Sequence, residues 1–203
     1  MKKRWRGFCL LSGAFFGASL WAASDMGQRL DLQVASDFAG QLQCNLSGHS
    51  RTFWIDPVED KRSSPVVAVL LHNDQETPVY SEKPLEVVLT KALKEGFEKC
   101  GLKTATHRQA ADIWVLPRLE KFSGASKKGW IKGEAKSEAT LTLQFVAHKK
   151  GTDFSETVSV GEEQKKGISK NPKKLEKMLN VLLTRLASQV FESSTPNTWL
   201  AEQ

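Results

Sequence analysis

The stretch "GEAKSEATLTLQFVA", residues 133–147, alternates apolar and polar side chains over its whole length. One face would carry Ala135, Ala139, Leu141, Leu143, Phe145 and Ala147, and the other Glu134, Lys136, Glu138, Thr140, Thr142 and Gln144. Because successive side chains of a strand point to opposite faces of a sheet, this pattern predicts an antiparallel strand with one buried face. A polar turn at 148–153 and the run at 154–163 then predict a meander.

Two amphipathic helices are predicted on either side of this meander. Residues 81–100 place apolar side chains at the i, i+3, i+4 and i+7 spacing of a core-facing helix. Ser81 can cap the start of that helix, and Gly101 can end it. Residues 171–190 repeat the spacing and open with Asn-Pro, which is typical of a helix start.

Shorter apolar runs predict the remaining strands. Residues 66–71 form one such run, and residues 111–122 form another whose first half is apolar on both faces. Trp54 and Trp114 lie within apolar strands, so we expect both in the core. The order of elements predicts an α+β domain over residues 51–193, with a mostly antiparallel sheet and two amphipathic helices packed on one face.

Residues 1–22 have the layout of a secretory signal peptide. Four basic residues precede an apolar run over 8–23, and small residues end that run. A transmembrane anchor is the competing interpretation, but it needs roughly 20 uninterrupted apolar residues, and Ser and Gly interrupt this shorter run. We therefore expect a periplasmic protein, exported by a cleaved signal peptide and either soluble or peripheral at a membrane.

The three cysteines are expected to have different fates. A bacterial lipid-anchor cysteine follows a Leu–small–small tripeptide at the end of the apolar run, whereas Cys9 follows Arg-Gly-Phe near its start. Cys9 is therefore expected to be removed with the signal peptide. Cys44 and Cys100 remain, and they either form a disulfide, as an oxidising compartment permits, or stay as separate thiols.

The charge of the chain excludes one large class of partners. The chain has 29 basic and 23 acidic residues, but four of the basic residues lie in the signal peptide. The remaining near-balance gives no electrostatic reason to expect nucleic-acid binding. Residues 23–50 are predicted to form a polar N-terminal extension, and residues 194–203 a C-terminal tail.

Catalytic motifs are missing from the sequence. None of the four histidines stands at a metal-ligand spacing, and no nucleophile elbow or phosphate-binding glycine loop occurs. Asp56, Glu59, Asp60 and His72 place polar groups on predicted loops, which we interpret as ordinary turns, with a carboxylate site as the alternative. We expect no catalytic residue, no metal and no cofactor, so the chain is not predicted to be an enzyme.

One loop is a candidate binding surface. Residues 123–134 join two predicted strands, and they place Trp130 and Ile131 among three lysines, Lys127, Lys128 and Lys132. An amphipathic aromatic side chain beside lysines suits an anionic lipid headgroup or an acidic protein surface. The alternative is that Trp130 already begins the next strand and points inward.

The succession "PLEVVLTKALKEGFEKCGLK", "ADIWVLPRLEKF", the alternating strand and "LNVLLTRLASQV" resembles the YajG-like family of bacterial envelope lipoproteins. The resemblance covers residues 53–192 and implies an envelope location and the fold above. It transfers no catalytic residue. The chain departs from the family in lacking a lipid-anchor cysteine and in carrying the additional segment 23–50.

Two functions follow from these observations. The first is a non-catalytic periplasmic accessory protein that binds an envelope protein or a peptidoglycan-associated partner. The alternative is a carrier of lipid or lipopolysaccharide that uses the sheet face or the Trp130 loop. A continuous apolar groove between helix and sheet would favour the carrier, whereas a tightly packed interface would count against it.

Overall fold

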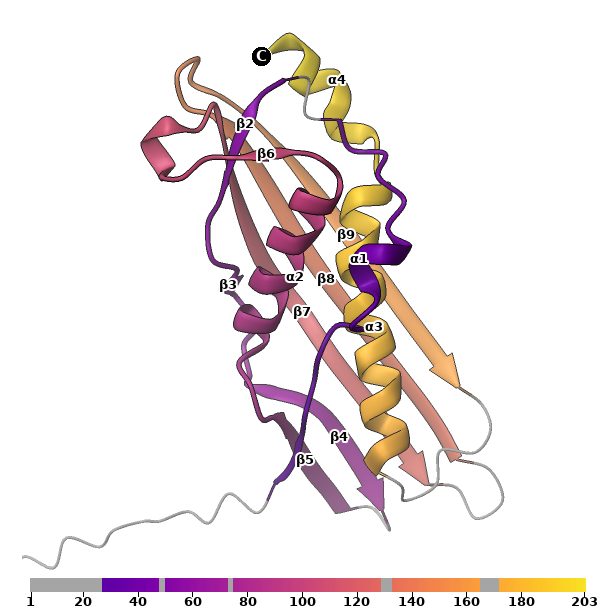
Figure 1. Ribbon diagram of the computed structural model, residues 1–203. Coiled ribbons are helices and arrows are strands. Elements are labelled where there is room, and N and C mark those ends of the chain that lie inside the picture. Colours follow the sequence, from indigo (N-terminus) through magenta and orange to yellow (C-terminus); the bar gives the residue numbers. More distant parts are fainter. Residues whose placement is uncertain (1–26, 48–49, 73–74, 129–132, 165–171) are drawn as a thin grey trace, which may run out of the picture.

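The computed structural model describes residues 27–47, 50–72, 75–128, 133–164 and 172–203 (Figure 1). The described strands are β1 (Gln28–Leu30), β2 (Thr52–Ile55), β3 (Glu59–Asp60), β4 (Val66–His72), β5 (Gln75–Ser81), β6 (Lys103–Thr104), β7 (Ile113–Lys128), β8 (Gly133–Ala147) and β9 (Thr152–Gln164). The described α-helices are α1 (Phe38–Gln41), α2 (Leu85–Lys99), α3 (Pro172–Glu192) and α4 (Thr195–Glu202). A 3-10 turn at Arg108–Ala110 precedes β7.

The alternating stretch forms β8, as predicted. Leu141, Leu143 and Phe145 are at most 1% exposed, and the residues between them are half-buried on the other face. β8 pairs antiparallel with β7 along one edge and with β9 along the other. These three long strands form the predicted meander, in which β8 lies between β7 and β9 and β9 forms the margin of the sheet in Figure 1.

The sheet as a whole is mixed, which corrects the prediction of a mostly antiparallel sheet. The pairings of β2, β3 and β4 with β7 are parallel, as are those of β1 with β5 and β2 with β6. β8 occupies one edge of β7, so β2, β3 and β4 follow one another along its opposite edge. The reason is the crossover through α2, which returns the chain to β7 in the direction of the earlier strands.

The core lies between the sheet and the two long helices. Figure 1 shows α1, α2 and α3 on the same side of the sheet, and the buried side chains of α2 and α3 join one core with those of β2, β7 and β8. Gly96 of α2 meets α3 so closely that an added Cβ would lie 2.3 Å from the ring of Phe191. The rings of Phe53 and Phe97 lie 5.5 Å apart, as do those of Phe97 and Phe191.

The N-terminal extension packs into this domain. Its described part runs across α2 and α3 and buries Leu30, Leu32, Phe38 and Leu46, each at most 3% exposed. The backbone amide of Gln33 donates to Asn180 Oδ1 at 3.0 Å, that of Ala35 donates to Thr184 Oγ1 at 3.0 Å, and those of Asn45 and Leu46 donate to the carbonyl of Phe191. We call residues 28–46 the strap.

The disulfide between Cys44 and Cys100 is present, with a Cα–Cα distance of 5.3 Å, so the first of the two predicted alternatives is confirmed. It links the end of the strap to the C-terminal end of α2. The C-terminal residues are also ordered on the domain, because α4 buries Pro196 and Leu200, and Trp199 stacks on Phe154 of β9.

Candidate functional site

Trp54 and Trp114 lie side by side on the face of the sheet opposite to the core. They are paired in the parallel register of β2 and β7. Their neighbours Phe53 and Ile113 are at most 1% exposed in the core, so the tryptophans point to the other face, where they are half-buried. The prediction that both belong to the core is therefore wrong.

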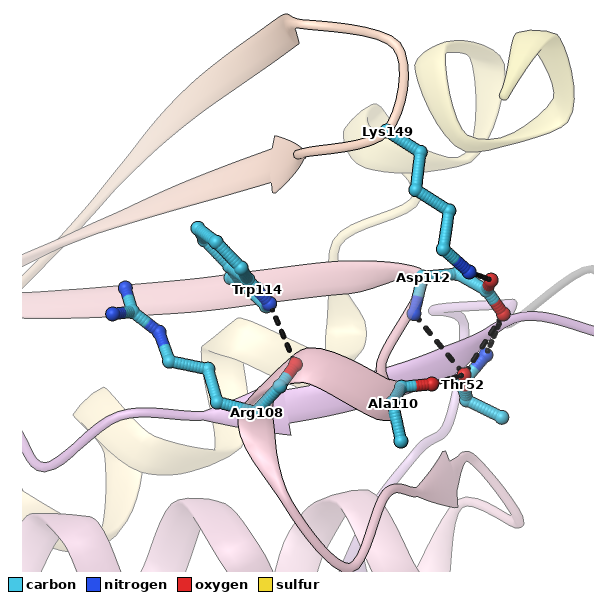
Figure 2. Close-up of polar contacts among 6 residues, drawn as sticks. All are labelled: Thr52, Arg108, Ala110, Asp112, Trp114 and Lys149. Atoms are coloured by element: carbon cyan, nitrogen blue, oxygen red, sulfur yellow. Dashed lines mark hydrogen bonds and ion pairs between the residues drawn. The ribbon is translucent and has the colours of Figure 1, made fainter.

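Trp114 is fixed by two flat groups. The ring of His148, from the turn between β8 and β9, stacks on it with centroids 4.4 Å apart and an angle of 3° between the planes. The guanidinium carbon of Arg108 lies 4.2 Å from the indole centroid, a cation–π distance. The indole Nε1 donates to the carbonyl of Arg108 at 2.8 Å, as Figure 2 shows.

Trp54 is joined to the same group of residues through a carboxylate. Its Nε1 donates a hydrogen bond to Asp56 Oδ1 at 2.7 Å. The other carboxylate oxygen, Oδ2, forms an ion pair with Arg108 Nη2 at 3.1 Å. We call Trp54, Asp56, Arg108, Trp114 and His148 the tryptophan patch. Two rigid indoles and an arginine held by internal contacts form a preorganised amphipathic surface.

Asp112 holds the strands beneath this patch in place (Figure 2). Its carboxylate accepts hydrogen bonds from Lys149 Nζ at 2.9 Å, from the Thr52 amide at 3.0 Å and from the Thr52 hydroxyl at 2.8 Å. These bonds, first the one from Lys149, lower the pKa of Asp112 to about 2. The network ties the starts of β2 and β7 to the β8–β9 turn.

The structure does not gather the predicted loop carboxylates into one site. Glu59 pairs with Lys61 and with Arg118, and Arg62 pairs with Asp60. Although burial raises the pKa of Asp60, the hydrogen bonds from Arg62 lower it below its usual value.

His72 lies at the far end of the sheet from Asp56. The backbone amide of Asp56 donates to the carbonyl of Val115, near the start of β7. Leu71, the neighbour of His72 in β4, pairs with Lys127 at the end of β7. From Val115 to Lys127, β7 rises by about 40 Å. A site that combines Asp56 and His72 is therefore excluded by the topology of the sheet.

The predicted binding loop is only partly within the described residues. Lys127 and Lys128 end β7, in register with Glu134 and Gly133 of β8. Trp130, Ile131 and Lys132 lie outside the described residues. The predictions for this loop therefore stay predictions.

Two properties of the described part of the chain bear on its chemistry. No three or more His, Cys, Asp or Glu side chains of that part are grouped in a way that could hold a metal ion. No helix of that part has the length and apolarity needed to cross a membrane.

Sequence reasoning missed the tryptophan patch because its members come from separate segments. A stricter use of the two-residue period would have placed Trp54 opposite the face of Phe53 and Ile55. No local pattern links Arg108 or His148 to the tryptophans, because a 3-10 turn and a hairpin turn bring them there.

Comparisons with known proteins agree with an envelope protein of this fold. None of the curated proteins matches the chain. Among solved structures, a protein from Xanthomonas campestris of the DUF330 family is 12% identical and has a TM-score of 0.55, with 86% of this chain and 98% of that chain covered. This similarity shows a shared fold.

Two solved lipoproteins are similar at lower TM-scores. A minor lipoprotein from Acinetobacter baumannii is 16% identical, covers 54% of this chain and 84% of its own, and has a TM-score of 0.37. The lipoprotein GNA1162 from Neisseria meningitidis is 14% identical, covers 70% and 99%, and has a TM-score of 0.30. The model of a family described as "uncharacterized lipoprotein" matches residues 44–198, most of the chain. The chain belongs to this lipoprotein family, Lipoprotein_16.

Proposed function

We propose that this chain is a non-catalytic accessory protein of the bacterial cell envelope, which works in the periplasm by binding another envelope protein through the tryptophan patch. The lipoprotein family indicates an envelope location. Export by the signal peptide 1–22 and a closer kinship with the YajG-like lipoproteins are parts of the same proposal.

The observation that carries the proposal is the position of Trp54 and Trp114. Both are held half-buried on the sheet face opposite to the long α-helices, although large apolar rings gain most by burial. Tryptophan and arginine are the residues most enriched at the energetic centres of protein interfaces. Preorganisation of the patch by Asp56 and His148 lowers the entropic cost of binding.

The patch extends along β7 and β8. Leu116 and Val146 are half-buried beside Trp114, and Arg118 is the next outward residue of β7 after Leu116. The arginines Arg108 and Arg118 are each neutralised by a carboxylate, Asp56 and Glu59. An apolar centre with a charge-paired rim is typical of a protein interface rather than of a strongly charged ligand site.

Packing between helices and sheet argues against the carrier alternative. Leu179, Leu182 and Leu183 of α3 are fully buried, so their side chains fill the space that a carried lipid would need. At Gly124 of β7, an added Cβ would already lie 3.1 Å from Leu179. A lipid carrier would instead need a continuous apolar groove here.

Photocrosslinking in living cells tests the proposal. A photoreactive amino acid is placed at Leu116 in the patch, at Trp130 in the predicted loop, and at the exposed control Lys94 on α2. A discrete protein adduct from position 116 and none from position 94 is the expected result. Adducts to lipid or lipopolysaccharide alone, from position 116 or 130, would contradict the accessory role and support the alternative function as a lipid carrier.

A further inference from the structure

β9 leaves a long edge of the sheet open. Among the described strands it pairs only with β8, and Figure 1 shows it at the margin of the sheet. The pairing with β8 continues over all 13 residues without a register shift. Open edges are usually shortened, bulged, or guarded by charged residues or proline. β9 is long and contains neither lysine nor proline, and its only charged residues are four carboxylates.

The four carboxylates of β9 do not guard the edge as free charges. Each contacts a polar group of the same chain: Asp153 contacts Gln144, Glu156 contacts Ser193, Glu162 contacts Arg185, and Glu163 contacts Lys136. Two of these carboxylates, Glu162 and Glu163, are neutralised by cations of the same chain, whereas Asp153 and Glu156 contact neutral groups. No described strand pairs with the backbone groups of the open edge.

We propose that β9 pairs antiparallel with β9 of a second copy of this chain, with Thr157 opposite Thr157 at the two-fold axis. The two sheets then form one continuous sheet. Because core-facing residues must continue the core face, only registers that place residues of the same face opposite each other are allowed.

The three allowed registers with the longest overlap are centred on Thr157, Val158 and Ser159. The positions of the charged residues distinguish among them. A register centred on Val158 places Asp153 opposite Glu163, and one centred on Ser159 places Glu156 opposite Glu162. Like charges directly opposite each other destabilise a pair of strands. The register centred on Thr157 has no such pair.

In that register, side chains of similar kind face each other on both faces, although Glu156 lies opposite Val158 on the core face. On the outer face Ser155 lies opposite Ser159, which continues the hydroxyl pairs that β8 and β9 already form at Thr142–Thr157 and Thr140–Ser159. On the core face Phe154 lies opposite Val160, and both are apolar side chains packed against the core of their own copy.

Engineered cysteines test the register in the full-length protein purified from the envelope fraction. In the proposed dimer two Thr157→Cys side chains face each other at a Cα distance of about 5 Å, within disulfide range. Two Ser159→Cys side chains would be about 13 Å apart along the strands. The expected result is an intermolecular disulfide for Thr157→Cys and none for the matched control Ser159→Cys.

Lysine substitutions test the dimer without added thiols. Thr157→Lys places two ammonium groups opposite each other and is expected to give a monomer by light scattering. Ser159→Lys faces Ser155 and is expected to keep the dimer, and each variant loses one equivalent hydroxyl contact. Wild-type protein that stays monomeric at high concentration would overturn the proposal, as would crosslinking at position 159 instead of 157.

Discussion

Asp112 is one residue through which pH should act on the stability of the fold. Its pKa is lowered from 3.8 to about 2, so its contribution to stability is fully present above pH 4 and is lost as the pH falls toward 2. Because the side chain is 33% exposed, solvent screens the effect, and we expect Asp112→Asn to cost about 1 kcal/mol at neutral pH.

Urea unfolding at several pH values measures this effect. The difference in unfolding free energy between wild type and Asp112→Asn should shrink as the pH falls from 4 to 2. A difference that stays constant over this range would show that the Asp112 carboxylate is not the titrating group.

Gly96 lies where α2 closely approaches Phe191 of α3, so an added side chain there would overlap the phenyl ring. Alanine favours a helix by about 1 kcal/mol over glycine, but the new methyl group would overlap the ring of Phe191. We expect Gly96→Ala to destabilise the protein by about 2 kcal/mol, because overpacking outweighs propensity.

A second glycine provides the control for this prediction. At Gly40 an added Cβ meets no atom within 4 Å, so Gly40→Ala should change stability little or raise it. Thermal unfolding of both variants compares them, and equal melting temperatures would contradict the close approach of α2 to Phe191.

At the scale of elements, the strap depends on the disulfide. The bond closes a loop with a sequence separation of 56 residues, so Cys44→Ser with Cys100→Ser should lower stability by about 3 kcal/mol. In that variant, hydrogen exchange should increase at the strap amides, including Gln33 and Ala35, more than in β8. Unchanged exchange at the strap would mean that its buried side chains and hydrogen bonds alone hold it.

The elements that could be predicted from the sequence are those with a local period. β8 and the two long helices carry their buried faces at regular spacing, so their patterns identify them. The parallel pairings of β7 could not be predicted in this way, because they join segments as distant as Val69 and Ala125. The tryptophan patch could not be predicted for a related reason. The start of β7 is apolar on both faces, so its sequence does not show which face Trp114 occupies.

The packing of the N-terminal extension on the domain also could not be predicted from local sequence patterns. Residues 23–50 are polar on average, yet four apolar side chains spaced along the strap are buried in the domain. Leu30 and Leu32 keep the two-residue period of a strand, but Phe38 and Leu46 follow neither a strand nor a helix period, so the sequence does not show that the whole segment packs on the domain.

At the scale of the whole molecule, the tight packing of the core predicts that the protein carries no lipid inside it. Among the described residues, leucines of α3 and side chains of the sheet pack into one buried core, so we expect no acyl chain between them. Native mass spectrometry of protein purified from envelopes should therefore show the mass of the polypeptide without lipid. Reproducible co-purification of one lipid per chain would contradict this packing argument.

The central claim is that the tryptophan patch binds an envelope protein. The most direct measurement is co-purification of the crosslinked partner with three forms of the chain: wild type, Trp54→Ala with Trp114→Ala, and the control Val87→Ala, which changes an exposed apolar residue on α2. The double variant should lose the partner while Val87→Ala retains it, and circular dichroism should show that both are folded. Equal recovery of the partner with all three forms would contradict the account.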